Sequence, residues 1–147
     1  MNENKNISLS FDFDGTIELP SIKEYARELI IKGYDVWITT TRFGDDALYK
    51  AEYHTTHHVD ETNFELFDLI KDIGLPLEKV HFTNMDNKWP YLKENNFVWH
   101  IDDDWTENKM ILKNCSPTKA ISSFGSPNWK QKCERIIKIY KKNLLKI

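Results

Sequence analysis

One segment constrains the fold of this chain more than any other: residues 12–16, with the sequence DFDGT. It directly follows the apolar run 7–11, which has the composition of a short strand, so two carboxylates and a tight turn fall where that strand should stop. Gly15 relaxes such a turn, and Thr16 can hold it with a hydroxyl hydrogen bond. An Asx-type turn would use the same residues, so the segment alone leaves a purely structural role open.

Three later apolar runs also end in polar residues. The run 34–41 ends in hydroxyls and Arg42, the run 80–84 is followed by Lys88, and the run 97–101 ends in Asp102, Asp103 and Asp104. In an open parallel sheet, functional groups collect where the strands reach their carboxyl ends. We therefore expect these positions to converge on one crevice, with the strand before Asp12 flanked by those ending near Thr40 and Ile101.

Helical patterns alternate with these strands. The apolar spacing predicts helices over residues 21–33, 62–74, 90–93 and 105–112, a strand over 119–122 and a last helix from Ser126. Two of the helices begin with the sequence of a capping box, at Ser21 and at Thr62. Such alternation predicts an α/β fold, a three-layer Rossmann-like domain with a central parallel sheet. Residues 1–147 are expected to form a single domain, with 43–61 as a small flap or insert.

The composition is that of a folded protein. Hydrophobic residues make up 40% of the chain and aromatic residues 13%, which excludes the disordered class. No apolar run approaches the roughly 20 residues that span a bilayer, so we expect a cytoplasmic protein without a membrane partner. Cys115 and Cys133 do not form a Cys-x-x-Cys motif and are expected to be reduced. The net charge of -3 gives no overall attraction to nucleic acid.

The four motifs, taken in order, resemble those of the haloacid dehalogenase (HAD) superfamily of phosphohydrolases over about residues 7–104. The resemblance supports Asp12 as a nucleophile and Asp14 as a general acid and base. It places a substrate-binding hydroxyl at Thr40, with Thr39 as the alternative, and a charge-balancing cation at Lys88. Dehalogenation itself is not expected, because Asp14 supplies the acid and base that a phosphatase of this superfamily uses and a dehalogenase lacks.

Several carboxylates around a phosphate require a cation, and hard carboxylate oxygens favour Mg²⁺. The expected metal ligands are Asp12 and Asp102 or Asp103, and the resemblance adds the main-chain oxygen of Asp14. Three consecutive aspartates leave the register open, and acids before a helix near Trp105 are also favoured without a metal. A zinc site among His54, His57 and His58 is an alternative, although ordinary surface histidines would give the same pattern.

The resemblance implies a Mg²⁺-dependent phosphatase that hydrolyses a phosphomonoester through an aspartyl-phosphate at Asp12. Thr40, Arg42 and Lys88 are expected to contact the substrate phosphate. One helix fills the interval after Thr16, which leaves no room for a large cap and is similar to the small capless members of the superfamily. Open sites of that kind admit bulky substrates.

The expected partner is a phosphorylated small molecule or a nucleotide, and the phosphorylated end of a nucleic acid is one candidate. Phe43, Trp89 and Trp105 are candidate stacking surfaces, although structural roles would explain all three equally well. A noncatalytic phosphate- or nucleotide-binding protein that keeps the HAD fold is the alternative function. A receiver-type signalling domain is excluded, because its acid pair precedes its acceptor aspartate along the chain.

Overall fold

A single parallel sheet organises the computed structural model, which describes residues 3–146. The five strands lie in the order β3-β2-β1-β4-β5. Their bounds are β1 Ser8–Phe11, β2 Asp35–Thr40, β3 Val80–Phe82, β4 Trp99–Asp102 and β5 Lys119–Ser122. The strand before Asp12 therefore lies between the strands that end at Thr40 and Asp102, which is the arrangement that the motif positions predict.

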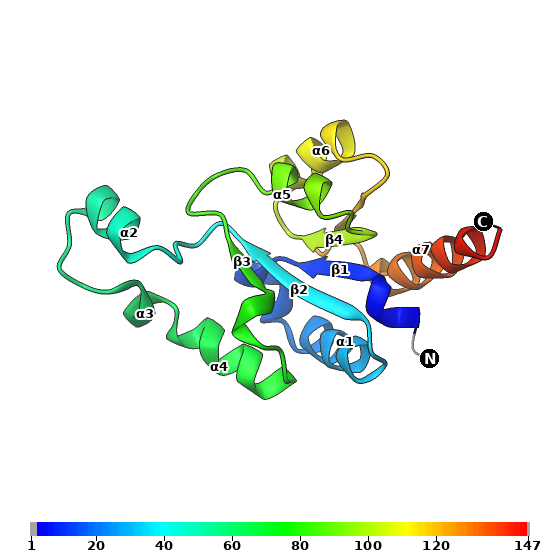
Figure 1. The fold of residues 1–147 in the computed structure, drawn as a ribbon, viewed down its shortest axis with the longest axis horizontal. Helices are drawn as coiled ribbons and strands as arrows, with labels where there is room; N and C mark the ends of the chain where they lie inside the picture. The colour runs from blue at the N-terminus through cyan, green and yellow to red at the C-terminus, as the bar shows by residue number, and fades with distance from the viewer. Residues whose placement is uncertain (1–2, 147) are drawn as a thin grey trace.

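Helices cover both faces of this sheet (Figure 1). They are α1 Pro20–Ile31, α2 Asp46–Tyr53, α3 Val59–Thr62, α4 Phe64–Ile73, α5 Trp89–Glu94, α6 Trp105–Asn114 and α7 Trp129–Leu144. One core joins the sheet to α1, α4 and α7, and a second core joins it to α5 and α6. The expected α/β fold with a central parallel sheet in a three-layer, Rossmann-like arrangement is thus confirmed.

The alternation of side chains along β1 explains how the two cores form. Leu9 and Phe11 are fully buried in the core on the α1 side, where the Phe11 ring lies 5.4 Å from that of Trp99. Burial of each such side chain contributes about 1.5–3 kcal/mol to folding. Ser10 points to the opposite face, and its register partner on β4 is His100. The second face of the sheet therefore carries polar side chains close to the carboxyl ends of the strands.

Both expected capping boxes are wrong. Leu19 occupies the cap position of α1 and Pro20 opens the helix, because the fixed φ of proline suits the first helical position. Thr62 ends α3 rather than starting α4, and its hydroxyl donates to the carbonyl of Val59 at 2.7 Å. Asn63 takes the cap position of α4, while its side chain serves another contact described below.

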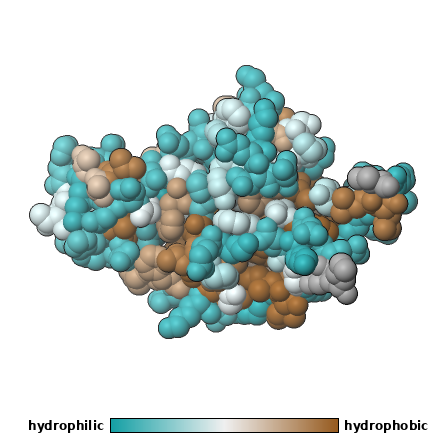
Figure 2. Space-filling model, in the orientation of Figure 1, coloured by the Kyte–Doolittle hydropathy of each residue, from teal (hydrophilic) through white to brown (hydrophobic). Residues whose placement is uncertain are grey.

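The expected insert at 43–61 contains α2 and all of α3 except Thr62, and these helices form an arm beyond the end of β2 (Figure 1). Every side chain of α2 is at least partly exposed. Figure 2 shows apolar groups within the otherwise hydrophilic surface of this arm, where Leu48 and Tyr53 are both exposed. Apolar side chains thus gather on the insert at the end of the molecule where β2 stops.

None of the helices described between residues 3 and 146 has the length and apolar character that crossing a membrane requires. Cys115 and Cys133 are free thiols, and both are buried.

Candidate active site

Two main-chain hydrogen bonds fix the backbone of Asp12. Its N–H donates to the carbonyl of Ile101 on β4 at 2.8 Å, and its own carbonyl accepts from the N–H of Ile17 at 3.1 Å. The turn between them passes through Gly15 at φ +74°, in the left-handed region that glycine enters without a steric penalty. Oδ2 of Asp12 accepts from the Thr16 hydroxyl at 3.1 Å, so the sequence DFDGT builds a turn that fixes its first carboxylate.

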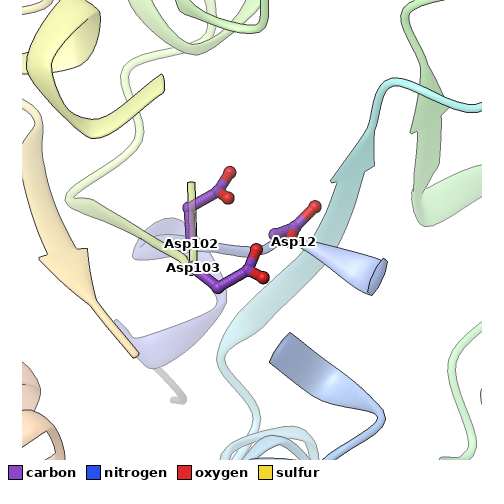
Figure 3. Close-up of side chains that lie close together, drawn as sticks. All are labelled: Asp12, Asp102 and Asp103. Carbon is purple, nitrogen blue, oxygen red and sulfur yellow. The ribbon is translucent and has the colours of Figure 1, made fainter. Parts of the chain in front are cut away.

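Three carboxylates meet at the ends of β1 and β4. Each of Asp12, Asp102 and Asp103 offers an oxygen, and these atoms all lie within 4.8 Å of one another. Figure 3 shows the three side chains facing a common space. A methyl group on Gly15 would lie 2.4 Å from Oδ2 of Asp103, so the turn passes this carboxylate only because residue 15 has no side chain. An all-oxygen donor set of this kind suits a hard cation such as Mg²⁺.

Lys88 lies between two of these acids. Its Nζ donates to Oδ1 of Asp12 and to Oδ2 of Asp102, both at 2.6 Å, and the side chain is almost fully buried. Burial disfavours the charge on Lys88, but the two carboxylates outweigh it and raise the lysine pKa. One cation faces two buried carboxylates here. Burial raises the pKa of Asp12 to about 8, with Asp102 adding to the rise and Lys88 opposing it.

Asp102 belongs to a second set of buried contacts. Its Oδ2 lies 2.8 Å from Nε2 of His100, and its Oδ1 accepts from the N–H of Asp104 at 3.0 Å. Burial opposes ionisation of Asp102, but the contacts with His100 and Lys88 outweigh it and lower the pKa of the carboxyl. Asp102 therefore carries the negative charge that Lys88 neutralises, whereas Asp12 is left with less compensation.

A polar chain continues from His100 into the sheet. Nδ1 of His100 lies 2.8 Å from Oγ of Ser10, which in turn lies 2.8 Å from Oγ1 of Thr39. These three residues are fully buried on adjacent strands. Burial also lowers the pKa of His100. Ser10 and His100 were not expected from the sequence, although each stands two residues before a key aspartate and so shares its face of the strand.

Asp14 does not join the three acids through its side chain. Its carboxylate forms a two-point ion pair with Arg42, in which Nε donates to Oδ2 at 3.0 Å and Nη2 donates to Oδ1 at 2.7 Å. The Nη1 group of Arg42 donates to the carbonyl of Thr62 at 2.9 Å. The side chain of Asp14 is 54% exposed, so it lies at the rim of the site rather than inside it.

A cavity of about 290 Å³ opens over the acids. Its lining residues are Asp12, Asp14, Thr41, Lys88, Asp102, Asp103, Asp104 and Glu107. Thr41 lines this cavity, whereas Thr40 is fully buried and its hydroxyl accepts from the N–H of Arg42 at 3.2 Å. Thr41 is therefore a candidate substrate contact that the sequence analysis missed, and Thr40 holds the backbone that presents Arg42.

The remaining candidates lie apart from the acids. Trp105 is 73% exposed, Trp89 packs against the core beneath α5 and α6, and Phe43 packs on the arm. His57 contacts Glu61, and His58 contacts Asp46. Within residues 3–146, the three histidines of the arm join no group of three metal-ligating side chains, so nothing in that part of the chain supports the zinc alternative.

Comparison with models of known protein families, with curated proteins and with solved structures found no match for this chain.

Proposed function

We propose that this chain is a Mg²⁺-dependent phosphomonoester hydrolase of the HAD superfamily that acts through an aspartyl-phosphate at Asp12. One observation carries the proposal: Asp12 stands at the end of a central strand with Lys88 on one oxygen and Asp102 and Asp103 within 4.8 Å. A carboxylate so placed has a cationic partner and further oxygen ligands for a metal, which phosphoryl transfer to a carboxylate requires.

In the first step, a carboxylate oxygen of Asp12 forms a bond to phosphorus and the ester P–O bond breaks. Asp14, protonated on one oxygen and held by Arg42 on the other in place of the two-point pairing, gives its proton to the departing alcohol oxygen. The position of Asp14 at the rim supports this role, because the leaving group must face the open side of the site. Lys88 balances the charge that gathers on the phosphoryl oxygens.

In the second step, a water molecule attacks phosphorus of the aspartyl-phosphate and gives a proton to Asp14. The bond between phosphorus and Asp12 breaks, which releases phosphate and restores both carboxyl groups to their starting states. The two steps therefore consume one water and one phosphomonoester, and they produce one alcohol and one phosphate.

The donor set would hold Mg²⁺ through Asp12 and Asp102 or Asp103, with the main-chain oxygen of Asp14 added by the resemblance. When bound, the ion would supply positive charge that reduces the repulsion between these carboxylates and a phosphate. The Thr41 hydroxyl, which lines the cavity, is the further contact that we assign to the phosphate, while Arg42 stays on Asp14. The free thiols of Cys115 and Cys133 favour a reducing compartment, so we place the activity in the cytoplasm.

The experiment is a screen of phosphorylated metabolites and of 3′- and 5′-phosphorylated oligonucleotides, with phosphate release measured with and without Mg²⁺. Asp12→Asn should abolish turnover, because an amide keeps the shape of the carboxylate but is a poor nucleophile. Asp14→Asn should slow turnover by about 10²- to 10⁴-fold and allow phosphorylated Asp12 to accumulate, detected by mass spectrometry after acid quench.

Asp68→Asn, at an exposed acid on α4, is the matched control. Wild-type turnover in Asp12→Asn would overturn the covalent route. Mg²⁺-dependent binding of phosphate compounds without any turnover would favour the alternative, a noncatalytic phosphate- or nucleotide-binding protein.

A further inference from the structure

A second cavity, of about 370 Å³, lies against the first. Asp14 and Thr41 line both cavities, so the two spaces meet at the proposed general acid. The volume falls within the range of small-molecule sites. Its outer part is lined by Phe43, Tyr49 and Tyr53 from the arm and by Met85 from the loop after β3.

The three rings form one aromatic cluster. Their centroids lie 5.9 Å apart for Phe43 and Tyr49, 5.7 Å for Phe43 and Tyr53, and 5.2 Å for the two tyrosines. Tyr49 and Tyr53 are four residues apart on α2 and so share one face of that helix. Phe43 is buried and Tyr49 is partly exposed, but Tyr53 is 53% exposed, so the cluster is not a closed core for the insert. The cluster thus presents ring surface to the cavity.

The walls of this cavity are fixed to the acid site by hydrogen bonds. Buried Asn63 donates from Nδ2 to the carbonyl of Phe43 at 2.8 Å, and Arg42 joins Asp14 to the carbonyl of Thr62. On the other side, Oδ1 of Asn84 accepts from the N–H groups of Gly44 at 2.9 Å and Asp45 at 3.2 Å. The aromatic cluster therefore keeps a defined position relative to Asp14.

Met85 reaches the cavity through an unusual backbone. Asn84 and Met85 have φ values of 55° and 72°, a left-handed conformation that is rare for two successive residues with side chains. The N–H of Met85 donates to the carbonyl of Thr41 at 2.8 Å, which holds the loop in place. The Met85 side chain is 61% exposed and faces the cavity that the rings line. Strain held in this way is typical of ligand-contacting loops.

We infer that this aromatic cavity binds the base of a nucleoside monophosphate whose phosphate lies at Asp12. The inference rests on the proposed function and names its substrate class. The aromatic rings offer flat surfaces on which any base can stack, and the Met85 thioether adds a polarizable contact. Asp14 stands between the two cavities, so the sugar spans the acid while the base reaches the rings. A phosphorylated sugar without a base would leave the rings uncovered.

The test compares adenosine 5′-monophosphate with ribose 5-phosphate, which has the same phosphorylated sugar but no ring system. We expect kcat/KM to favour the nucleotide by about tenfold or more, as stacking on aromatic side chains predicts. Tyr53→Ala should remove most of that ratio, and Tyr53→Phe should keep it. Phe64→Ala, at an exposed aromatic residue of α4 outside the cavity, should leave the ratio unchanged.

Two further substrates separate the sources of the base. If kcat/KM is higher for an oligonucleotide with a terminal phosphate than for the free nucleotide, the cavity binds the terminal base of a nucleic acid. Phenyl phosphate used as well as the nucleotide would overturn the inference, because the ring would then need no sugar spacer.

Binding to Asp12→Asn, measured by calorimetry with the same two compounds, separates this inference from the proposed function. Preferential binding of the nucleotide without hydrolysis by the wild-type protein would uphold the cavity assignment and overturn the hydrolase. Hydrolysis of both compounds with equal kcat/KM would uphold the hydrolase and overturn the cavity assignment. Failure of both compounds to bind would overturn the cavity assignment as well.

Discussion

The Arg42 guanidinium donates two hydrogen bonds to the Asp14 carboxylate, with Nε 3.0 Å from Oδ2 and Nη2 2.7 Å from Oδ1. Arg42 leaves the end of β2, and Asp14 lies in the turn after β1, so the pair connects two strand ends that bound the site. The sequence led us to expect Arg42 on a substrate oxygen. The geometry instead gives it a partner within the protein, which orients the proposed general acid.

Replacing Arg42 by lysine tests this orientation. A lysine keeps the charge but lacks the planar fork that meets both carboxylate oxygens, so kcat/KM should fall by about tenfold or more. The measurement is steady-state hydrolysis of the best substrate from the screen. Arg27→Lys is the matched control, because Arg27 pairs with Glu24 and Asp72 and lines neither cavity. Equal losses in the two variants would contradict the role of the ion pair.

The positions of the main catalytic candidates could be predicted from sequence because they follow from strand ends. Asp12 follows β1 and Asp102 ends β4, and these two strands are parallel and adjacent, so their meeting needs only that pairing. Lys88 follows β3 at the sheet edge and reaches both acids from the residue before α5. The pattern brings Asp12, Lys88 and Asp102 together, and the contacts of Lys88 with both acids agree with it. The sequence pattern does not fix which side chains contact one another, because those contacts depend on the path of the loop after each strand.

Thr40 and Thr41 both carry hydroxyl groups at the end of β2. Only the path of the backbone there decides that Thr41 lines the cavity. Ser10 and His100 meet because β1 and β4 pair in one register, and a shift of one residue would separate them. Such pairings depend on the whole sheet, so a local pattern could not reveal them.

Gly15→Ala should weaken metal binding. The added methyl group would meet Oδ2 of Asp103, so the carboxylate must leave its present position beside Asp12 and Asp102. We expect the apparent Mg²⁺ affinity, measured by calorimetry, to fall by about tenfold, in the range reported when groups around a metal ligand are changed. The backbone strain alone should cost about 1 kcal/mol of stability.

Gly74→Ala separates these two effects. Gly74 ends α4 at φ +80°, and a methyl group there would have no neighbour within 4 Å. It should therefore lose a similar amount of stability in chemical denaturation while keeping Mg²⁺ affinity. If both variants lost Mg²⁺ affinity equally, displacement of Asp103 would not be the cause.

His100→Ala should destabilise the protein by about 2–3 kcal/mol, because Ser10 and Asp102 would each lose a buried hydrogen-bond partner. The free energy of unfolding from urea titration measures this loss. His57→Ala is the control, since within residues 3–146 the exposed His57 side chain pairs with exposed Glu61 alone, and its N–H bond to Thr55 would remain. A change below about 0.5 kcal/mol in His100→Ala would show that the buried chain contributes little.

The raised pKa of Asp12 predicts an unusual pH dependence for the stability of the metal-free protein. This pKa is raised by burial to about 8 in the folded state, so between pH 4 and 8 the folded protein retains a proton that the unfolded chain has lost. Stability from this group is therefore complete below about pH 4 and is lost as the pH rises through 8. The lowered pKa of His100 acts in the opposite direction, but only below its usual value of 6.5.

The window from pH 6.5 to 8 thus isolates Asp12. In the presence of a chelator, the free energy of unfolding of the wild-type protein should fall by roughly 1 kcal/mol per pH unit across this window. Asp12→Asn cannot titrate at this position and should show a flatter profile in the same urea titrations. Added Mg²⁺ should stabilise the wild-type protein more at pH 8 than at pH 6.5, because binding at Asp12 requires the ionised carboxylate. Parallel profiles for the two proteins would mean that the buried carboxyl group ionises normally and that Lys88 alone compensates its charge.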